Sequence, residues 1–169
     1  EDNHIRIFED NVIYSLIDNY NSWVEEDTFH EEDAIFSELT PISKFTFLKG
    51  YIFRNNNPAV FGIRVDVGFL RQKIAFMNKA GKKIGVIHQL QHESKTVEVA
   101  KTGQEVACSV QNITIGRQIK EDDVFYTLPP PDDAKQYLKK FKHKLNSDEL
   151  KVLNEIVEII RITNPIYGY

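Results

Sequence analysis

The fold is decided by the stretch Val97-Glu98-Val99-Ala100-Lys101-Thr102-Gly103-Gln104-Glu105-Val106-Ala107-Cys108-Ser109-Val110. Apolar and polar residues alternate on both sides of Gly103, which predicts two β-strands joined by a turn at the glycine. The same alternation, again interrupted by glycine, recurs over residues 60–68 and 82–90. Several short strands at close spacing, with no helix between them, favour a small closed barrel over a βαβ sheet.

The strand pattern fills residues 41–128, which we expect to form the barrel domain. Asparagine-rich and glycine-containing segments at residues 55–58 and 78–81 have the composition of turns. Three consecutive prolines, beginning at Pro129, close the segment. The pattern predicts about seven strands, at residues 44–53, 59–67, 73–77, 83–92, 96–99, 104–111 and 123–128.

Residues 10–40 have the periodicity of one long acidic helix. Asp10 or Asn11 offers an N-cap, and Pro41 ends the pattern. Apolar residues recur at helical spacing at Ile13, Leu16, Ile17, Tyr20 and Val24. A continuous helix would be about 43 Å long, whereas a kink at the acidic residues between 25 and 33 is the alternative. Before it, Ile5 to Phe8 has the pattern of a strand within residues 1–9.

Residues 129–169 predict two amphipathic helices that form a hairpin on the barrel. Asp132 and Asp133 suit the first turn of the first helix. Ser147 is the predicted N-cap of the second, which ends before Asn164 and Pro165. The expected fold is therefore mainly β with helices: a long linker helix, a β-barrel and a C-terminal two-helix hairpin.

Charge is unevenly distributed along the 169 residues. Residues 1–40 carry 12 acidic and 1 basic side chain, whereas residues 41–128 carry 7 acidic and 13 basic ones. A basic barrel behind an acidic arm suggests that the barrel binds a polyanion. No apolar run approaches the ~18 residues of a membrane helix, and no signal peptide is visible. The single cysteine, Cys108, excludes an internal disulfide and predicts a buried residue in a cytoplasmic protein.

Catalytic and metal-binding patterns are absent from the sequence. No segment fits the phosphate-binding loop G-x-x-x-x-G-K-[ST]. The five histidines, at positions 4, 30, 88, 92 and 143, have no metal-ligand spacing, and one cysteine cannot complete a zinc site. An enzyme is therefore the least favoured class of function.

Four stretches carry a resemblance to a known family: Leu48–Arg54, Asn57–Ala59, Thr114–Lys120 and Thr163–Gly168. Together with the barrel pattern they resemble the C-terminal part of the archaeal initiation factor five B family. That family is the counterpart of bacterial initiation factor two among the translational GTPases. The resemblance implies that residues 1–9 are a remnant of a preceding α/β domain. It also implies that this chain is a fragment without cofactor or catalysis, with GTP and magnesium bound by an upstream domain.

The resemblance further implies that the barrel binds the methionylated acceptor end of initiator tRNA and supports ribosomal subunit joining. In the bacterial factor the pocket is built from two strand ends and a Gly-aromatic-Glu turn. Here Gln91, His92 and Glu105 stand at those strand ends, and Gly103-Gln104-Glu105 keeps the Gly and Glu but not the aromatic residue. Cations predicted to contact tRNA phosphates are Arg54, Arg64, Lys95, Arg117 and Lys120.

The alternative function is a protein-interaction module, without tRNA contact, that docks the tail of initiation factor one A. The C-terminal hairpin keeps more apolar side chains than so short a segment easily buries. A groove for a partner would use Ile159, Ile162, Ile166, Tyr167 and Tyr169. The simpler interpretation is that the same residues cap the core of the barrel.

Overall fold

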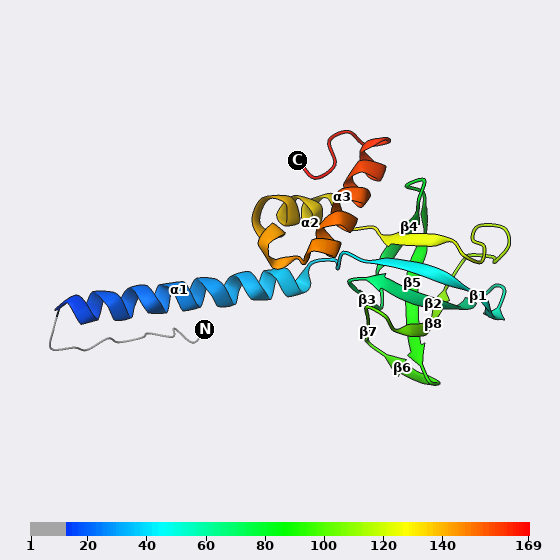
Figure 1. Cartoon of the computed structure of the whole chain (residues 1–169), viewed down its shortest axis with the longest axis horizontal. Coiled ribbons are helices and arrows are strands. Elements are labelled where there is room, and N and C mark those ends of the chain that lie inside the picture. Colours follow the sequence, from blue (N-terminus) through cyan, green and yellow to red (C-terminus); the bar gives the residue numbers. More distant parts are fainter. Residues whose placement is uncertain (1–12) are drawn as a thin grey trace. The chain divides into compact units, whose positions relative to one another are not determined.

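Figure 1 shows the computed structural model of the chain, which describes residues 13–169. The chain divides after Leu39 into two compact units. The first contains α1 (Ile13–Glu38), a single α-helix that runs through the acidic residues without interruption. Glutamate is a strong helix former, so the charged run does not break the helix. The predicted strand at residues 1–9 and the N-cap at Asp10 or Asn11 lie outside the described residues. Within the described part, no helix is sufficiently long and apolar to span a membrane.

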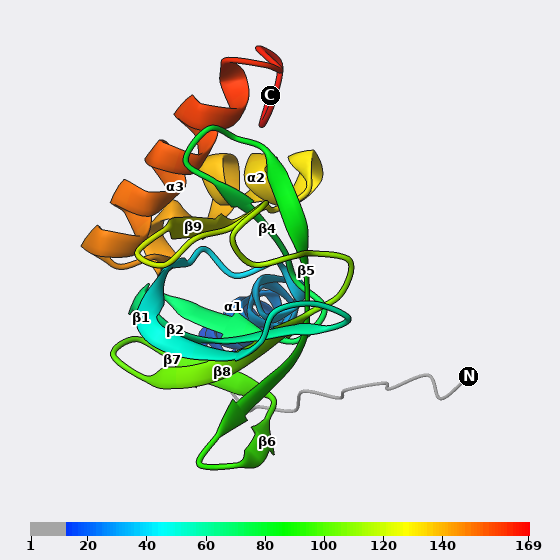
Figure 2. The same ribbon diagram turned by 90° about the vertical axis from the view of Figure 1, so that its right-hand side faces the viewer.

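The second unit is built around a closed ring of strands. Its main sheet has the order β4-β9-β1-β2-β8-β5-β6, and an additional β4–β5 pairing closes six of these strands into a barrel (Figure 2). The strands of this sheet are β1 (Lys44–Arg54), β2 (Ala59–Val67), β4 (Ala75–Asn78), β5 (Lys83–His92), β6 (Lys95–Val97), β8 (Glu105–Val110) and β9 (Val124–Thr127). The predicted mainly-β barrel with helices is confirmed.

Two short strands differ from the prediction. β3 (Phe69–Arg71) and β7 (Val99–Lys101) pair with each other in a separate two-stranded sheet. The predicted strand 96–99 is therefore split between β6 and β7. β3 was not predicted, because it follows β2 after only one residue, Gly68, which turns the chain with φ at 75°. A Cβ atom at Gly68 would collide with the carbonyl oxygen of Ile42, so this turn requires glycine.

The barrel core is a single cluster of buried apolar side chains. At its centre the rings of Phe45, Phe76 and Phe125, from strands β1, β4 and β9, lie with centroids 5.4–5.5 Å apart. Such edge and tilted contacts favour a fixed aromatic packing. Cys108 is fully buried in the same cluster, as predicted, and burial raises the pKa of its thiol to about 12.

The C-terminal segment is a helical hairpin beside the barrel. α2 (Pro131–Gln136) continues as a π-helical turn, η1 (Tyr137–Phe141), and a 3-10 turn, η2 (Lys142–Lys144), before α3 (Ser147–Arg161). The predicted N-cap of α3 was wrong by one residue. Asn146 caps the helix, because its side-chain oxygen accepts from the backbone N–H groups of Asp148 and Glu149. The Glu149 carboxylate accepts in return from Asn146 N, which completes a capping box.

Two sets of polar contacts fix the hairpin to the barrel. The carboxylate of Glu155 in α3 accepts from Tyr126 Oη at 2.7 Å and from Lys44 Nζ at 3.1 Å. Thr40, the first residue of the second unit, donates its N–H to Asp133 and accepts from the Tyr137 hydroxyl. The first set joins α3 to β1 and β9, and the second joins the start of the hairpin to the residue before β1.

Candidate nucleic-acid interface

The candidate site lies on the outer face of the barrel, on the side of the strands opposite the core. Registers between β2, β8 and β5 align outward residues in cross-strand rows. One row joins Gly62, Ala107 and Gln91, and the next joins Val60, Ser109 and Gln89. Gly62 and Ala107 have almost no side chain, so the middle of this face is hollow. The small residues at these positions therefore leave a depression that crosses β2, β8 and β5.

An irregularity of β1 builds one wall of this depression. The pairing of Phe47 with Ile63 is followed by that of Ile52 with Phe61, so five steps along β1 match two along β2. Within this bulge Gly50 has φ at 80°, and its N–H donates to the carboxylate of Glu121 at 2.8 Å. A Cβ atom on Gly62 would lie 2.6 Å from Tyr51 Cβ. The glycine thus allows Tyr51 to lie directly against β2.

The depression and its wall form one groove. Its larger part has a volume of about 590 Å³, and a second part of about 350 Å³ shares Phe53, Val60, Gln91 and Ala107 with it. These volumes fall within the ~300–1,000 Å³ typical of small-molecule sites. Hereafter the groove means the residues that line both parts: Leu48, Tyr51, Phe53, Arg54, Pro58, Val60, Gly62, Gln89, Gln91, His92, Glu93, Ser94, Glu105, Val106, Ala107 and Ser109.

Predicted site residues are brought together at one end of the groove. Gln91 and His92 end β5, and Glu105 begins β8, so the three side chains line the same hollow. The tight turn after His92 has Glu93 and Ser94 in the left-handed region, with φ at 48° and 64°. His92 Nδ1 is hydrogen-bonded to the carbonyl oxygen of Glu105 at 3.0 Å. The side chains meet as the sequence predicted, while their predicted contact with tRNA stays a prediction.

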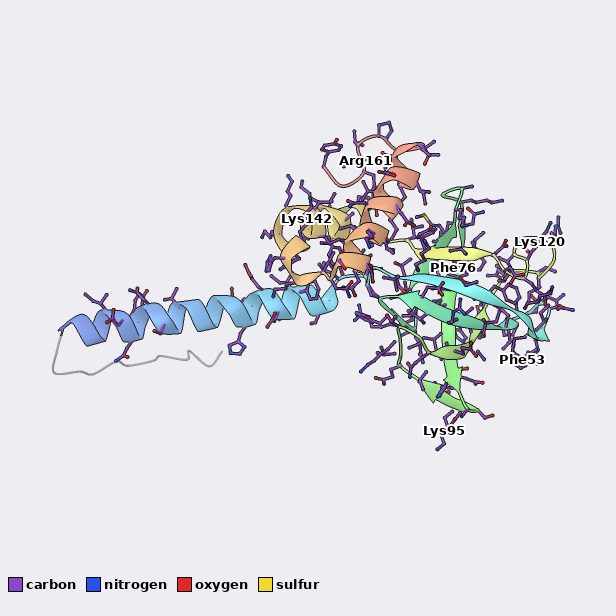
Figure 3. All side chains as sticks on the ribbon, in the orientation of Figure 1. Phe53, Phe76, Lys95, Lys120, Lys142 and Arg161 are labelled. Carbon is purple, nitrogen blue, oxygen red and sulfur yellow. The ribbon has the colours of Figure 1, made fainter. Side chains whose placement is uncertain are left out.

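The predicted cations are distributed over several places. Arg54 lines the narrower part of the groove. Arg64 is the cross-strand neighbour of Glu105, but its guanidinium pairs with Asp66 at 3.1 Å. Lys95 begins β6 and does not line the groove. Arg117 and Lys120 belong to the loop between β8 and β9, and Figure 3 shows Lys120 at the same end of the barrel as Phe53. The structure therefore does not gather these five cations into one cluster.

Sequence reasoning missed the aromatic wall. Residues 44–53 were interpreted as a regular strand, which places alternate side chains inside. In the structure Tyr51, Ile52 and Phe53 are all exposed, and Phe53 remains 63% accessible. The order Gly50-Tyr51-Ile52-Phe53 could have indicated exposed aromatic residues. Successive side chains of a strand point to opposite faces, so three large apolar residues in a row cannot all face one core.

The C-terminal residues predicted to contact a partner separate into buried and exposed ones. Tyr167 is buried and donates its hydroxyl to the carbonyl oxygen of Pro129 at 2.6 Å, so it is not part of an exposed surface. Ile159 is half-buried and packs against Gly81 at the β4–β5 turn. Ile162, Ile166 and Tyr169 are 83%, 78% and 70% exposed. Only these three keep the exposure that docking requires.

Metal coordination receives no support from the part of the chain that the structure describes. In residues 13–169 no group of three or more His, Cys, Asp or Glu side chains is close enough to hold a metal ion. The groove offers aromatic rings for stacking, hydrogen bonds with His92 and Gln91, and the carboxylate of Glu105.

Comparison with known proteins relates the chain to a family. The family model for elongation factor Tu domain 4 matches residues 41–126. A curated relative from Ignicoccus hospitalis, "Probable translation initiation factor IF-2", is 39% identical over 97% of this chain. Another of the same name, from Hyperthermus butylicus, is 40% identical over the same share. This chain spans about 27% of the length of both relatives.

A solved structure agrees with these sequence relatives. The crystal structure of GDP-bound aIF5B from Aeropyrum pernix superposes with a TM-score of 0.76 and 36% sequence identity. The match covers 97% of this chain and 28% of that one. The resemblance to the C-terminal part of archaeal initiation factor five B, expected from the four sequence stretches, is confirmed. The chain belongs to the elongation factor Tu domain 4 family and is similar to part of the IF-2/aIF5B translation initiation factors.

Proposed function

We propose that the groove holds the methionylated 3′ acceptor end of initiator tRNA, and that the full-length GTPase uses this grip during ribosomal subunit joining. The observation that carries the proposal is the pairing of an aromatic wall with polar strand ends in one hollow. Tyr51 and Phe53 offer flat surfaces on which an unpaired base can stack, a contact worth about 1–3 kcal/mol per base. The apolar lining at Val60 and Ala107 suits a thioether side chain, which packs well beside aromatic rings.

The carboxylate of Glu105 supplies a way to recognise the amino acid. Among the described residues Glu105 has no ion pair, because its cross-strand neighbour Arg64 pairs with Asp66 instead. A methionyl ester carries a free α-ammonium group, and a carboxylate can accept a charge-assisted hydrogen bond from it. Glu105 would therefore favour the charged tRNA whose amino group is free.

A titration with three ligands tests this function. The 169-residue chain would be titrated with initiator tRNA that is uncharged, methionylated, or methionylated and N-acetylated. We expect the methionylated form to bind most tightly, and Glu105→Gln to remove its advantage over the acetylated form. Glu98→Gln is the matched control, because Glu98 is exposed and does not line the groove. Equal affinity for all three ligands would refute methionine recognition.

The second candidate is docking of the tail of initiation factor one A on the hairpin. It rests on the exposure of Ile162, Ile166 and Tyr169, which follow or end α3. Replacing both isoleucines with serine should abolish binding of a tail peptide and leave tRNA binding unchanged. Unchanged peptide affinity in this variant would remove docking at the hairpin.

A further inference from the structure

A second hollow lies between the β4–β5 turn and the loop that joins β8 to β9. It has a volume of about 550 Å³ and is lined by Asn78, Lys82, Lys83, Ile84, Arg117 and Gln118. None of these residues lines the groove. Three of the six are cations and none is acidic. The hollow therefore differs from the groove in both position and chemistry.

The lysine side of the hollow is held by a fixed turn. The side-chain oxygen of Asn78 accepts from the backbone N–H groups of Ala80 and Lys82, each at 3.0 Å. Gly81 occupies the left-handed region with φ at 77°, and its N–H donates to the Asn78 carbonyl oxygen. These bonds fix the backbone from which Lys82 and Lys83 project. The turn thus fixes where the two lysines leave the backbone, while their exposed side chains stay free to reach a ligand.

The arginine side is held by a second network. Gln118 Oε1 accepts from Thr114 N at 2.6 Å, and Gly116 N donates to the Ile119 carbonyl oxygen at 2.7 Å. The loop is also bound to the β1–β2 turn, where Ile115 N donates to the Asn55 carbonyl oxygen at 3.0 Å. Arg117 is therefore carried by a loop that is held by its own hydrogen bonds and by one bond to the β1–β2 turn.

The three cations are exposed and uncompensated. Among the described residues neither Lys82, Lys83 nor Arg117 forms an ion pair. Lys44, Arg64 and Lys151, by contrast, pair with Glu155, Asp66 and Asp148. Like charges that surround one concavity focus a positive potential there and attract an anion. Arg117 adds a planar donor suited to two phosphate oxygens.

We propose that this hollow binds backbone phosphates of double-stranded RNA, independently of the groove. We infer a duplex rather than a single strand from the lining of the hollow. Its only apolar residue is Ile84, and it has no aromatic ring on which an unpaired base could stack. Duplex RNA is recognised largely through its phosphates and shape. The chain would then grip RNA at two places, one reading a single-stranded end and the other holding a helix.

The probe is a blunt RNA hairpin without a single-stranded 3′ end, measured by fluorescence anisotropy at two salt concentrations. Lys82→Glu with Lys83→Glu should weaken binding about tenfold or more and lower the salt exponent by about 2, one per lost phosphate contact. Arg117→Gln should act in the same direction. The matched control is Lys139→Glu with Lys140→Glu, an exposed adjacent pair on the helical hairpin. It changes the net charge equally and should alter affinity less than threefold.

Failure of this proposal is distinguishable from failure of the groove. Phe53→Ala should leave binding of the blunt hairpin unchanged, whereas the lysine pair should not change the ratio of affinities for methionylated and uncharged tRNA. Equal losses in the two lysine pairs, or none in the first, would refute the hollow as a site. So would displacement of the RNA by inorganic phosphate at concentrations similar to those of RNA phosphate, because the hollow would then bind free phosphate rather than a duplex.

Discussion

His92 Nδ1 lies 3.0 Å from the carbonyl oxygen of Glu105, and this contact joins the two strand ends of the groove. A carbonyl oxygen can only accept, so Nδ1 carries the proton and donates. The other ring nitrogen, Nε2, then remains available as an acceptor in the neutral imidazole. The backbone of the facing strand thus sets the tautomer of His92 and leaves Nε2 without a partner among the described contacts.

Substitutions at His92 should separate its two roles. Asparagine places its amide nitrogen near the position of Nδ1, so His92→Asn should keep the bond to Glu105 and lose Nε2. We expect its stability to match wild type and its affinity for methionylated tRNA to fall about 2–10-fold, the range of one hydrogen bond. His92→Ala should lose the same affinity and also about 0.5–1.5 kcal/mol of unfolding free energy. Urea unfolding and anisotropy would measure both, and full affinity in His92→Asn would contradict the role of Nε2.

The contact between Gly62 and Tyr51 predicts that substitutions at these two positions have strongly non-additive effects on stability. Gly62→Ala should lower the free energy of unfolding by about 1–3 kcal/mol, because the new Cβ would lie 2.6 Å from Tyr51 Cβ. Tyr51→Gly removes that atom, so the double variant should be less destabilised than the sum of the single ones. A double-mutant cycle by thermal unfolding tests this. Simple additivity would show that Tyr51 does not rest on Gly62 in solution.

The Glu155 carboxylate predicts a pH-dependent stability. Burial alone would raise its pKa, but hydrogen bonds from Tyr126 and Lys44 outweigh that effect and hold the pKa below its ordinary 4.5. Stabilisation by the carboxylate is therefore complete above this value and is lost as the pH falls through the lowered folded pKa. The side chain is 41% exposed, so water screens the contacts and about 0.5–1 kcal/mol is expected.

Glu155→Gln tests this linkage. The variant should be less stable than wild type at pH 7, and the difference should shrink as both proteins are titrated toward pH 3. Urea unfolding across that range, at constant salt, gives the two curves. Curves that remain parallel would mean that the ionised carboxylate does not stabilise the fold.

Tyr167 and Ile166 are adjacent in sequence, but substitution of Tyr167 should lower the stability of the fold and substitution of Ile166 should not. Tyr167→Phe leaves the Pro129 carbonyl oxygen without its 2.6 Å donor and should cost about 1–3 kcal/mol. Ile166→Ser removes a side chain that is 78% exposed and should change stability by less than about 0.5 kcal/mol. Thermal unfolding distinguishes them, and a large loss in Ile166→Ser would indicate hidden packing of the C-terminus.

The barrel was predictable because alternation and glycine placement report directly on which face of a strand is buried. Gln91, His92 and Glu105 were named from the resemblance to the bacterial pocket, and the strand pattern alone only placed them at strand ends. The aromatic wall was not, since it depends on a bulge in β1 that changes the pairing register without changing the apolar pattern. Asn146 was missed as the N-cap of α3 because Ser147 next to it is an equally good cap in sequence, and only the backbone decides between them. Tyr167 was assigned to the surface because its partner, a backbone carbonyl 38 residues away, leaves no trace in side-chain patterning.

The closed order of the barrel strands has a consequence for how the groove can work. The floor and walls of the groove belong to β1, β2, β8 and β5. These four strands are consecutive in the ring, and each is hydrogen-bonded to the next. Moving these strands apart would break backbone hydrogen bonds between neighbouring strands. The backbone that forms the groove is therefore rigid. A ligand must adopt the shape of the groove, and the protein gives up little conformational freedom when it is filled. If the groove selects by fit, its selectivity should depend on the size and stiffness of the side chain that enters, and we expect a longer or branched side chain to bind more weakly than methionine.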